Sequence, residues 1–293
     1  MSSIIRFSPD LSAWISQNLD QGATPTALMT VMRQQRMEEL AAQAITQAFV
    51  TARRTGRKVP VDHVVIDEIS LDYIYPSPLF GAGNRIQTAD RLVHINARAE
   101  RPFLANLSNV FSTEECAQLI ELARPRLTKS TIVDPMTGKN IVSEKRTSYG
   151  MFFKLNENDF IAKLDQRISA IMNLPIEHGE GIQILYYPTG AGSDPHFDFL
   201  TPLNPLNHAS LNRSGQRCST LVTYLNHVEE GGETVFPEAG WAVSPIPGNA
   251  VYFEYANAHG QVDHASLHAS NPVITGEKWV ATKWMRQRPF VSA

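Results

Sequence analysis

The part of the chain after Glu180 reads as a series of short strands separated by turns. Stretches rich in β-branched and aromatic residues follow one another, with Gly, Pro and Asn between them: GIQILYYP, CSTLVTYLN, ETVFP, NAVYFEY and KWVATKWM. Many short strands with little helix between them are typical of a two-sheet jelly roll or a related barrel. We therefore expect an α+β protein whose core is a double-stranded β-helix, or jelly roll.

The first hundred residues have a different character. Ser8-Pro9 and Thr24-Pro25 each place a capping residue before a proline at the first position of a helix, and apolar residues then recur at helical spacing. The later stretch VDHVVIDEI reads as a strand, and YPSPLFGAGN is rich in turn residues. We expect a helical N-terminal segment, residues 1–100, to which no feature assigns a chemical role.

Two further helices should lie between this segment and the strands. The stretch FLANLSNVFSTEECAQLIELARPRL fits a short strand followed by a helix capped at Ser112 or Thr113, with acidic residues in its first turn. The stretch NDFIAKLDQRISAIMNL fits a second helix. Together with the later strands, they predict one domain over residues 101–293 in which helices support the jelly roll.

The charge balance and the cysteine content exclude several classes of protein. The chain has 26 basic and 29 acidic residues, which offers no electrostatic basis for binding a nucleic acid. Cys116 and Cys218 are too few for a disulfide framework or a cysteine-based zinc site. The N-terminus lacks a basic region before a long apolar run. We expect a soluble, cytoplasmic protein without a nucleic-acid or membrane partner; nothing in the sequence indicates its oligomeric state.

A short H-x-D motif lies in the stretch DPHFDF, residues 194–199. Side chains two residues apart on a strand point to the same side, so His196 and Asp198 can bind one metal ion while the intervening phenylalanines pack elsewhere. Alone, the motif is short enough to occur by chance. A third ligand would have to come from a distant strand, and the segment DHASLHASNPVITGEKWVATKW offers His264 and His268.

This set of candidate ligands favours one metal over another. Two histidines and a carboxylate form the facial triad of non-haem Fe(II) oxygenases, which leaves adjacent positions of the metal open. Zinc is more usually bound by a third histidine, by paired cysteines or by an H-E-x-x-H helix, and neither of the last two patterns occurs in the sequence. The pattern therefore favours iron(II).

Longer segments around these residues resemble the catalytic core of the prolyl 4-hydroxylase family of 2-oxoglutarate-dependent dioxygenases: YYPTGAGSDPHFDF, CSTLVTYLNHVEEGGETVFPEAGWAVSPIPGNAVYF and SLHASNPVITGEKWVATKW. They occur in the family's order and with its spacings, from about residue 101 to residue 290. The resemblance implies an enzyme that uses Fe(2+), 2-oxoglutarate and O2, with ascorbate as a further candidate cofactor. It also implies that oxidative decarboxylation of 2-oxoglutarate is coupled to hydroxylation of a C–H bond.

By this resemblance, His196, Asp198 and His268 are the iron ligands and the catalytic residues. His268 is the family's distal ligand because it stands in S-L-H before the run P-V-x-x-G-x-K-W, and His264 is its nearest competitor. The family places a basic residue ten positions after the distal histidine to pair with the 5-carboxylate of 2-oxoglutarate, and Lys278 holds that position. A buried dianion needs such a counter-charge.

Three further residues match positions that line the family's co-substrate pocket. Tyr224, in VTYLN, matches a tyrosine whose hydroxyl binds the same distal carboxylate, and Tyr187, in YYPTG, matches a tyrosine near the iron and the 1-carboxylate or the substrate. Thr282 matches a hydroxyl that lines the pocket. Without the resemblance each would be read as a core or rim residue of a strand. We expect Trp279 and Trp284 in the core.

The resemblance implies a peptide or protein substrate, hydroxylated at a residue such as proline, with a free amino acid or small metabolite as the alternative. Arg146, Ser148 and Tyr149, in KRTSYGMFF, fall where the family has a strand that lines the substrate groove, so they are candidate substrate contacts. The loop of residues 200–217 follows the H-x-D motif directly. It either covers the site and selects the substrate or is an inert insertion.

Two other classes of protein are consistent with parts of the pattern. One is a non-catalytic binding module that keeps the jelly roll, and the other is a cupin-like metal enzyme of another reaction type. Lys278 argues against both, because neither needs a cation for a co-substrate. Asp198 occupies the position that is Ala or Gly in the related halogenases, so hydroxylation is favoured over halogenation.

Overall fold

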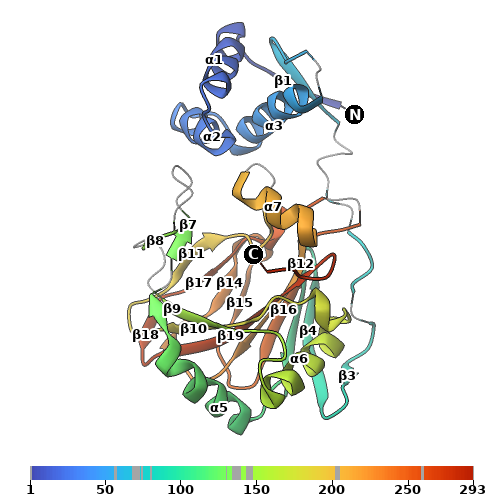
Figure 1. Ribbon diagram of the computed structural model, residues 1–293, viewed down its shortest axis with the longest axis vertical. Coiled ribbons are helices and arrows are strands. Elements are labelled where there is room, and N and C mark those ends of the chain that lie inside the picture. The colour runs from blue at the N-terminus through green and yellow to red at the C-terminus, as the bar shows by residue number, and fades with distance from the viewer. Residues whose placement is uncertain are drawn as a thin grey trace. The chain divides into compact units, whose positions relative to one another are not determined.

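The structure is a computed structural model of the chain of 293 residues (Figure 1). It describes residues 2–55, 58–67, 73, 75–79, 81–129, 131–133, 140–142, 148–201, 205–258 and 261–292. The chain divides into two compact units. The smaller unit consists mainly of residues 1–74, and the larger one of residues 75–132, 140–200 and 210–293.

The smaller unit is built from helices around a core of its own. Its elements are helices α1 (Pro9–Asp20), α2 (Pro25–Gln34) and α3 (Glu39–Thr55) and the antiparallel strands β1 (Ser2–Arg6) and β2 (His63–Asp67). Ser8 and Thr24 cap α1 and α2 with their side chains, as the sequence predicted. The core includes Ile15, Leu28 and Phe49. Strand β1 lies in a stretch where no strand was expected.

The larger unit contains two antiparallel sheets that form the predicted jelly roll (Figure 1). The nine-stranded sheet has the order β3 (Arg85–Gln87), β4 (Leu92–Glu100), β5 (Phe103–Ser108), β16 (Ala250–Glu254), β12 (Arg217–Tyr224), β19 (Lys278–Arg286), β10 (Ile182–Tyr187), β9 (Tyr149–Phe153) and β6 (Thr128–Lys129). The four-stranded sheet has the order β11 (Ser193–His196), β17 (His268–Ser270), β14 (Thr234–Phe236) and β15 (Trp241–Val243). Two further strand pairs are β13 (Glu230–Gly231) with β18 (Val273–Thr275) and β7 (Thr131–Val133) with β8 (Asn140–Val142).

Helices α5 (Thr113–Ala123) and α6 (Asp159–Met172) support the large sheet, as expected. Ser112 caps α5 in a capping box, and Asn158 caps α6. A third helix, α7 (Pro205–Ser214), lies in the stretch that we expected to be a loop. Short 3-10 helices are η1 (Arg124–Arg126), η2 (Ile176–His178), η3 (Pro237–Ala239) and η4 (His264–Ser266).

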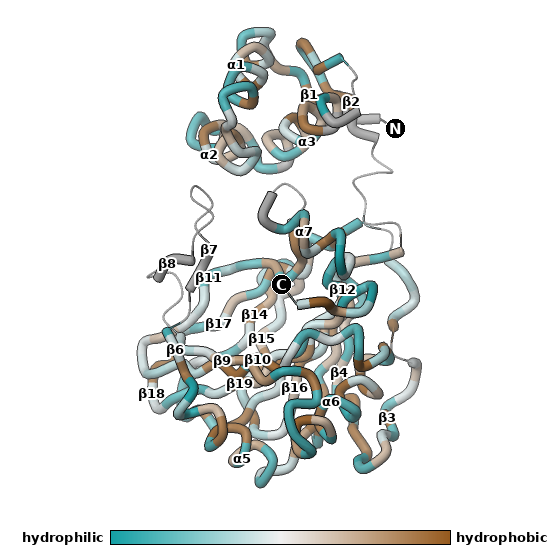
Figure 2. The backbone as a smooth tube through the Cα atoms, in the orientation of Figure 1, coloured by the Kyte–Doolittle hydropathy of each residue, from teal (hydrophilic) through white to brown (hydrophobic). Residues whose placement is uncertain are grey.

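The two faces of the large sheet bury different parts of the core. On β10, Ile182 and Ile184 face the helices α5 and α6, whereas Leu185 and Tyr187 face the four-stranded sheet. Figure 2 shows hydrophobic residues along β9 and β10. Because side chains alternate between the faces, every second residue of β10, β12 and β19 points into the jelly roll. This inner face carries the functional site.

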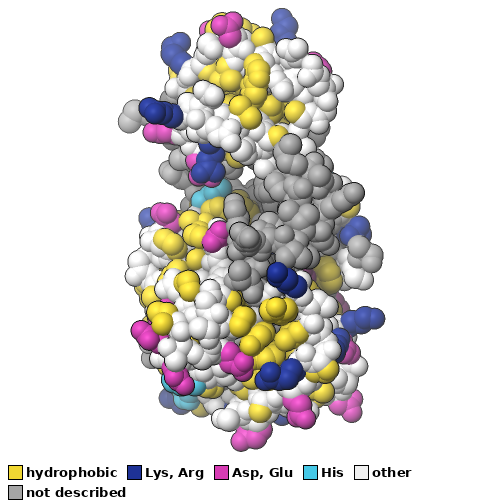
Figure 3. Space-filling view, turned by 90° about the vertical axis from the view of Figure 1, so that its left-hand side faces the viewer, with side chains coloured by type: hydrophobic (Ala, Val, Ile, Leu, Met, Phe, Trp, Pro, Cys, Tyr) yellow, Lys and Arg dark blue, Asp and Glu magenta, His cyan; other side chains and the backbone are white. Residues whose placement is uncertain are grey.

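The strands β3 and β4 belong to the nine-stranded sheet, although the sequence placed residues 85–100 in the N-terminal segment. Within the described residues, no helix combines the length and the apolar character needed to cross a membrane. Acidic and basic side chains are interspersed on the described part of the face drawn in Figure 3.

Candidate active site

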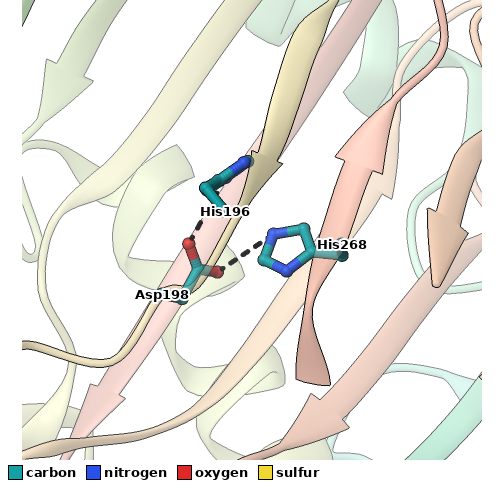
Figure 4. A group of neighbouring side chains, drawn as sticks. All are labelled: His196, Asp198 and His268. Carbon is teal, nitrogen blue, oxygen red and sulfur yellow. Dashed lines mark ion pairs between the residues drawn. The ribbon is translucent and has the colours of Figure 1, made fainter. Parts of the chain in front are cut away.

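His196, Asp198 and His268 come together at the mouth of the jelly roll (Figure 4). His196 ends β11 and His268 begins β17, and these two residues are paired across the two strands. Asp198 lies in a bend just beyond β11. One possible ligand atom from each of the three side chains lies within 4.8 Å of the others. Of the residues that the structure describes, only these three form such a group of His, Cys, Asp and Glu side chains.

Backbone carbonyl groups fix the direction of both imidazole rings. His196 Nδ1 lies 2.8 Å from the carbonyl oxygen of Asp194, and His268 Nδ1 lies 3.1 Å from that of Ser266. When each Nδ1 carries the ring proton and donates a hydrogen bond to its carbonyl, the unprotonated Nε2 points its lone pair toward the Asp198 carboxylate. The Nε2 atoms of His196 and His268 lie 3.8 and 3.7 Å from the two oxygens of Asp198.

Burial and charge set the protonation states that a metal requires. Burial lowers the pKa of His268 to about 4, so this imidazole is neutral at pH 7. Burial alone would raise the pKa of Asp198, but the charges of the two histidines and of Arg217 outweigh it and bring this pKa to about 2. Thr220 Oγ1 donates a hydrogen bond of 2.8 Å to Asp198 Oδ2. Two histidines and one carboxylate are a ligand set that suits iron(II).

His264 does not reach this group. Its ring packs edge-on against Phe197 and Phe199, with centroids 5.3 and 5.4 Å apart. The phenylalanines of the DPHFDF stretch stack on each other with their centroids 4.6 Å apart. The strand pairing of β11 with β17 therefore brings His268, and not His264, next to His196 and Asp198.

A narrow cavity runs from the three side chains to Lys278. The Lys278 residue is only 2% exposed, and its Nζ donates a hydrogen bond of 2.8 Å to Ser270 Oγ. Within the described residues, Lys278 makes no salt bridge, although the charge of Glu233 acts on its ammonium group. Its Nζ lies 5.4 Å from the ring centre of Tyr187 and 5.8 Å from that of Tyr224. A buried cation without an acidic partner fits an anionic ligand such as a carboxylate of 2-oxoglutarate.

The other residues expected in this pocket differ in their positions. Tyr187 and Thr282 line the cavity. Tyr224 is fully buried, and its hydroxyl donates a hydrogen bond of 2.9 Å to Thr234 Oγ1. Thr234 itself lines the cavity, as does Ser270, and neither was singled out from the sequence. The signal that could have found them is the alternation of β14 and β17, whose small hydroxyl residues face inward.

A second cavity, of about 650 Å³, opens on the other side of His196 and Asp198 and is here called the outer cavity. Trp284 lines both cavities, although we expected it to be a core residue. Gln183 Oε1 and Trp284 Nε1 are buried and make no hydrogen bond of standard geometry within the described chain; the indole lies near Asp198 and helps lower its pKa. Sequence reasoning also missed Gln183, a polar residue within the apolar strand GIQILYYP.

The expected substrate contacts of KRTSYGMFF do not line these cavities as far as the structure describes them. Arg146 lies outside the described residues. Ser148 is fully buried. The ring of Tyr149 packs against Tyr186, with centroids 6.1 Å apart, on the sheet face that is opposite to Phe152. Phe152, on the same strand, lines the outer cavity, whereas we had expected Tyr149 to contact the substrate.

A jelly roll that carries a His-Asp-His group beside a buried cation defines an Fe(II)- and 2-oxoglutarate-dependent oxygenase. The family model of the 2OG-Fe(II) oxygenase superfamily matches residues 182–286. The chain is 39% identical to "Probable prolyl 4-hydroxylase 10" of Arabidopsis thaliana over 201 residues, which cover 62% of this chain and 68% of the relative. It is 34% identical to "Probable prolyl 4-hydroxylase 3" of the same organism over 246 residues, which cover 78% and 83%.

Among solved structures, the viral collagen prolyl hydroxylase vCPH of Paramecium Bursaria Chlorella virus-1 is similar, with 26% identity and a TM-score of 0.49. The match covers 62% of this chain and 95% of that protein. The extent and identity of the sequence matches show that the chain belongs to the prolyl 4-hydroxylase family. It is a 2-oxoglutarate-dependent dioxygenase, and it uses Fe(2+), 2-oxoglutarate and O2.

Proposed function

We propose that this enzyme hydroxylates a residue within a peptide or protein, with proline as the first candidate. The observation that carries this proposal is the outer cavity, which opens beside His196 and Asp198 and is about 650 Å³ in volume. Its wall offers a buried acceptor, Gln183 Oε1, which makes no hydrogen bond within the described chain. A backbone N–H of a bound peptide can donate to this oxygen. The names of the relatives support proline as the residue.

We propose specific roles for the residues at the centre of the site. His196, Asp198 and His268 hold the iron, and Lys278 pairs with the distal carboxylate of 2-oxoglutarate. When bound, iron(II) and 2-oxoglutarate supply the oxidising chemistry that inserts one oxygen atom of O2 into a C–H bond, with release of succinate and carbon dioxide. The chain itself places the ligands, neutralises the co-substrate and excludes water.

Other residues complete the co-substrate pocket in this proposal. Tyr187 and Thr282 line the path from the iron ligands to Lys278. Tyr224 acts through Thr234, because the tyrosine hydroxyl already donates a hydrogen bond to Thr234 Oγ1. This arrangement presents the threonine hydroxyl, rather than the tyrosine hydroxyl, to the cavity. Arg146 stays a predicted substrate contact, whereas the positions of Ser148 and Tyr149 lead us to propose Gln183 and Phe152 instead.

The test is to incubate the protein with Fe(II), 2-oxoglutarate and O2 and to offer proline-containing peptides and free amino acids separately. We expect a gain of one oxygen atom in a peptide by mass spectrometry, together with an equal amount of succinate. Asp198→Ala should abolish both products because it removes a proposed metal ligand. Asp159→Ala, which changes an exposed carboxylate of α6 that lines neither cavity, is the matched control and should retain both.

Each other outcome identifies a different function. Hydroxylation of a free amino acid but of no peptide would replace the peptidyl substrate by the small-molecule alternative. Absence of succinate with every substrate, despite bound iron, would favour a binding module. If Lys278→Ala left the affinity for 2-oxoglutarate unchanged, the role of this cation would be wrong, whereas the role of the three iron ligands would stand.

We also propose that the two units are separate domains, with the catalytic domain beginning near residue 75 rather than at residue 101, because β3 and β4 belong to its sheet. Residues 1–74 then form the N-terminal domain.

A cytoplasmic location is our further proposal, supported by Cys116 and Cys218, which are both free and buried. Ascorbate is proposed as an accessory cofactor on the family resemblance alone.

A further inference from the structure

A third cavity, of about 510 Å³, lies next to the outer cavity and is here called the flanking cavity. Its walls are mainly apolar and are formed by Phe152, Phe153, Lys154, Leu155, Glu180, Gly181, Phe290 and Ser292. Phe152 lines both this cavity and the outer cavity. The two cavities therefore adjoin at a single aromatic side chain, which is 50% exposed.

The two cavities follow each other along the paired strands β9 and β10. Phe152 of β9 is paired with Gln183 of β10, which lines the outer cavity. Gly181, two residues earlier in the chain, lines the flanking cavity. Two residues of extended chain span about 7 Å. When an extended peptide places its reacting residue in the outer cavity, a side chain two or three residues further along therefore reaches the flanking cavity.

The chemistry of the flanking cavity favours an apolar side chain. Phe152, Leu155 and Phe290 supply carbon surface. The carboxylate of Glu180 is already paired with Arg217 and Arg286, at 2.7 and 3.0 Å, so it offers little net charge to a ligand.

The wall that Phe290 forms is held in place by the backbone. Phe290 N donates a hydrogen bond of 2.7 Å to the carbonyl oxygen of Glu177, and Val291 N donates one of 2.9 Å to Ser214 Oγ. These bonds anchor the C-terminal segment to residues near η2 and at the end of α7. The cavity is therefore a built feature of the fold rather than the result of a loose chain end.

We propose that the flanking cavity is a specificity subsite that binds an apolar side chain of the peptide substrate, two or three residues from the hydroxylated residue. This proposal rests on the proposed peptidyl function. In this proposal, Phe152, Leu155 and Phe290 select the substrate sequence and take no part in the reaction itself. Burial of one leucine-sized side chain should lower KM by about tenfold.

The experiment uses the full chain and a set of proline-containing peptides in which one leucine is moved through a background of alanine and serine. We expect kcat/KM for hydroxylation to be about tenfold higher when the leucine stands two or three residues from the proline on one side. Phe290→Ala should remove this preference, mainly through KM, and Phe290→Leu should largely restore it. Val291→Ala, which alters a neighbouring side chain that is 53% exposed, should keep the preference.

The outcomes separate this inference from the function on which it rests. If the parent protein hydroxylates peptides but shows no positional preference for leucine, the subsite is wrong and the peptidyl function stands. The same conclusion follows if Phe290→Ala and Leu155→Ala, both folded by thermal melting, keep the preference. If the parent hydroxylates no peptide at all, the peptidyl function fails and this inference fails with it.

Discussion

Lys278 is buried in the narrow cavity beside the proposed iron ligands, where its ammonium group donates a hydrogen bond to the Ser270 hydroxyl. Burial lowers the pKa of Lys278 to about 7, although the charge of Glu233 opposes the shift. A carboxylate of 2-oxoglutarate beside the amine would raise this pKa again. Binding of the co-substrate should therefore take up a proton at any pH above 7. The apparent affinity for 2-oxoglutarate should fall by up to about tenfold for each pH unit above about 7.5.

This linkage can be measured by isothermal titration of 2-oxoglutarate into the anaerobic Fe(II)-loaded protein at pH 7 and pH 9. Two buffers with different ionisation enthalpies give the number of protons taken up. Lys278→Met should bind weakly and with little dependence on pH, because it removes the titrating group. Equal affinities of the parent protein at both pH values would mean that Lys278 stays protonated when the pocket is free.

Glu254 is a second buried group, and its protonation should change the free energy of unfolding. Burial raises the pKa of Glu254 to about 7, although Leu79 N–H and the Tyr252 hydroxyl donate hydrogen bonds to its carboxylate. Between about pH 4.5 and pH 7, the folded state thus binds more protons than the unfolded state. The free energy of unfolding should decrease as the pH rises through this range, by on the order of 2–3 kcal/mol in total, and stay low above it.

The variant Glu254→Gln keeps an acceptor oxygen but cannot ionise, so it should be more stable than the parent at pH 8 and lose that advantage near pH 5. Urea unfolding of both proteins at the two pH values measures the difference. Glu238→Gln, at an exposed position, is the matched control and should change neither value. A stability difference that does not change with pH would show that Glu254 is ionised throughout.

Helix α6 is tied to its neighbours by one arginine that the sequence pattern gave no reason to notice. The side chain of Arg167 is fully buried, and it donates hydrogen bonds of 2.6 Å to both oxygens of Glu115 on α5. It also pairs with Asp90. Arg167→Met should destabilise the fold by about 3–5 kcal/mol, because it removes the closest cation of the buried Glu115 carboxylate.

Denaturant unfolding followed by circular dichroism measures this loss. Arg126→Met is the comparison, because Arg126 forms an ion pair of 2.7 Å with Glu157 at a much more exposed place. That variant should lose about 1 kcal/mol or less. Similar losses for the two variants would contradict the view that burial makes the Arg167 pairs indispensable.

The elements of the jelly roll could be predicted from the sequence to different degrees. Local rules found most strands and the caps at Ser8, Thr24 and Ser112, because alternation and capping depend on neighbours in the chain. The alternation rule also brought His196 and Asp198 together, although β11 ends at His196 and Asp198 lies in a bend. Helix α7 was missed, because its polar residues give a weak helical pattern.

Across the whole molecule, the limit of sequence reasoning is the pairing of distant strands. The local sequence could not distinguish His264 from His268 as the third ligand, because the pairing of β11 with β17 is non-local. The family resemblance favoured His268, and the strand register places His268 opposite His196. The same limit explains why β3 and β4 were placed in the N-terminal segment. Trp284 and Gln183 were missed because a cavity is a property of the assembled sheets.

The two units of the chain should unfold separately. The smaller unit has its own buried core, which includes Ile45 and Phe49, and the proposed iron ligands all belong to the larger unit. Differential scanning calorimetry of the full chain should show two transitions, because each core can melt without the other. Fe(II) with 2-oxoglutarate, without oxygen, should raise the transition of the larger unit by roughly 5–10 °C at a hundredfold excess over Kd.

The smaller unit's transition should stay where it is, because neither ligand binds to it. Removal of the iron with a chelator should reverse the shift of the larger unit, and Asp198→Ala should show no shift from the start. One transition that moves as a whole with the ligands would mean that the units unfold together. In that case the N-terminal helices would contribute directly to the stability of the catalytic unit, and a boundary near residue 75 would not divide independent domains.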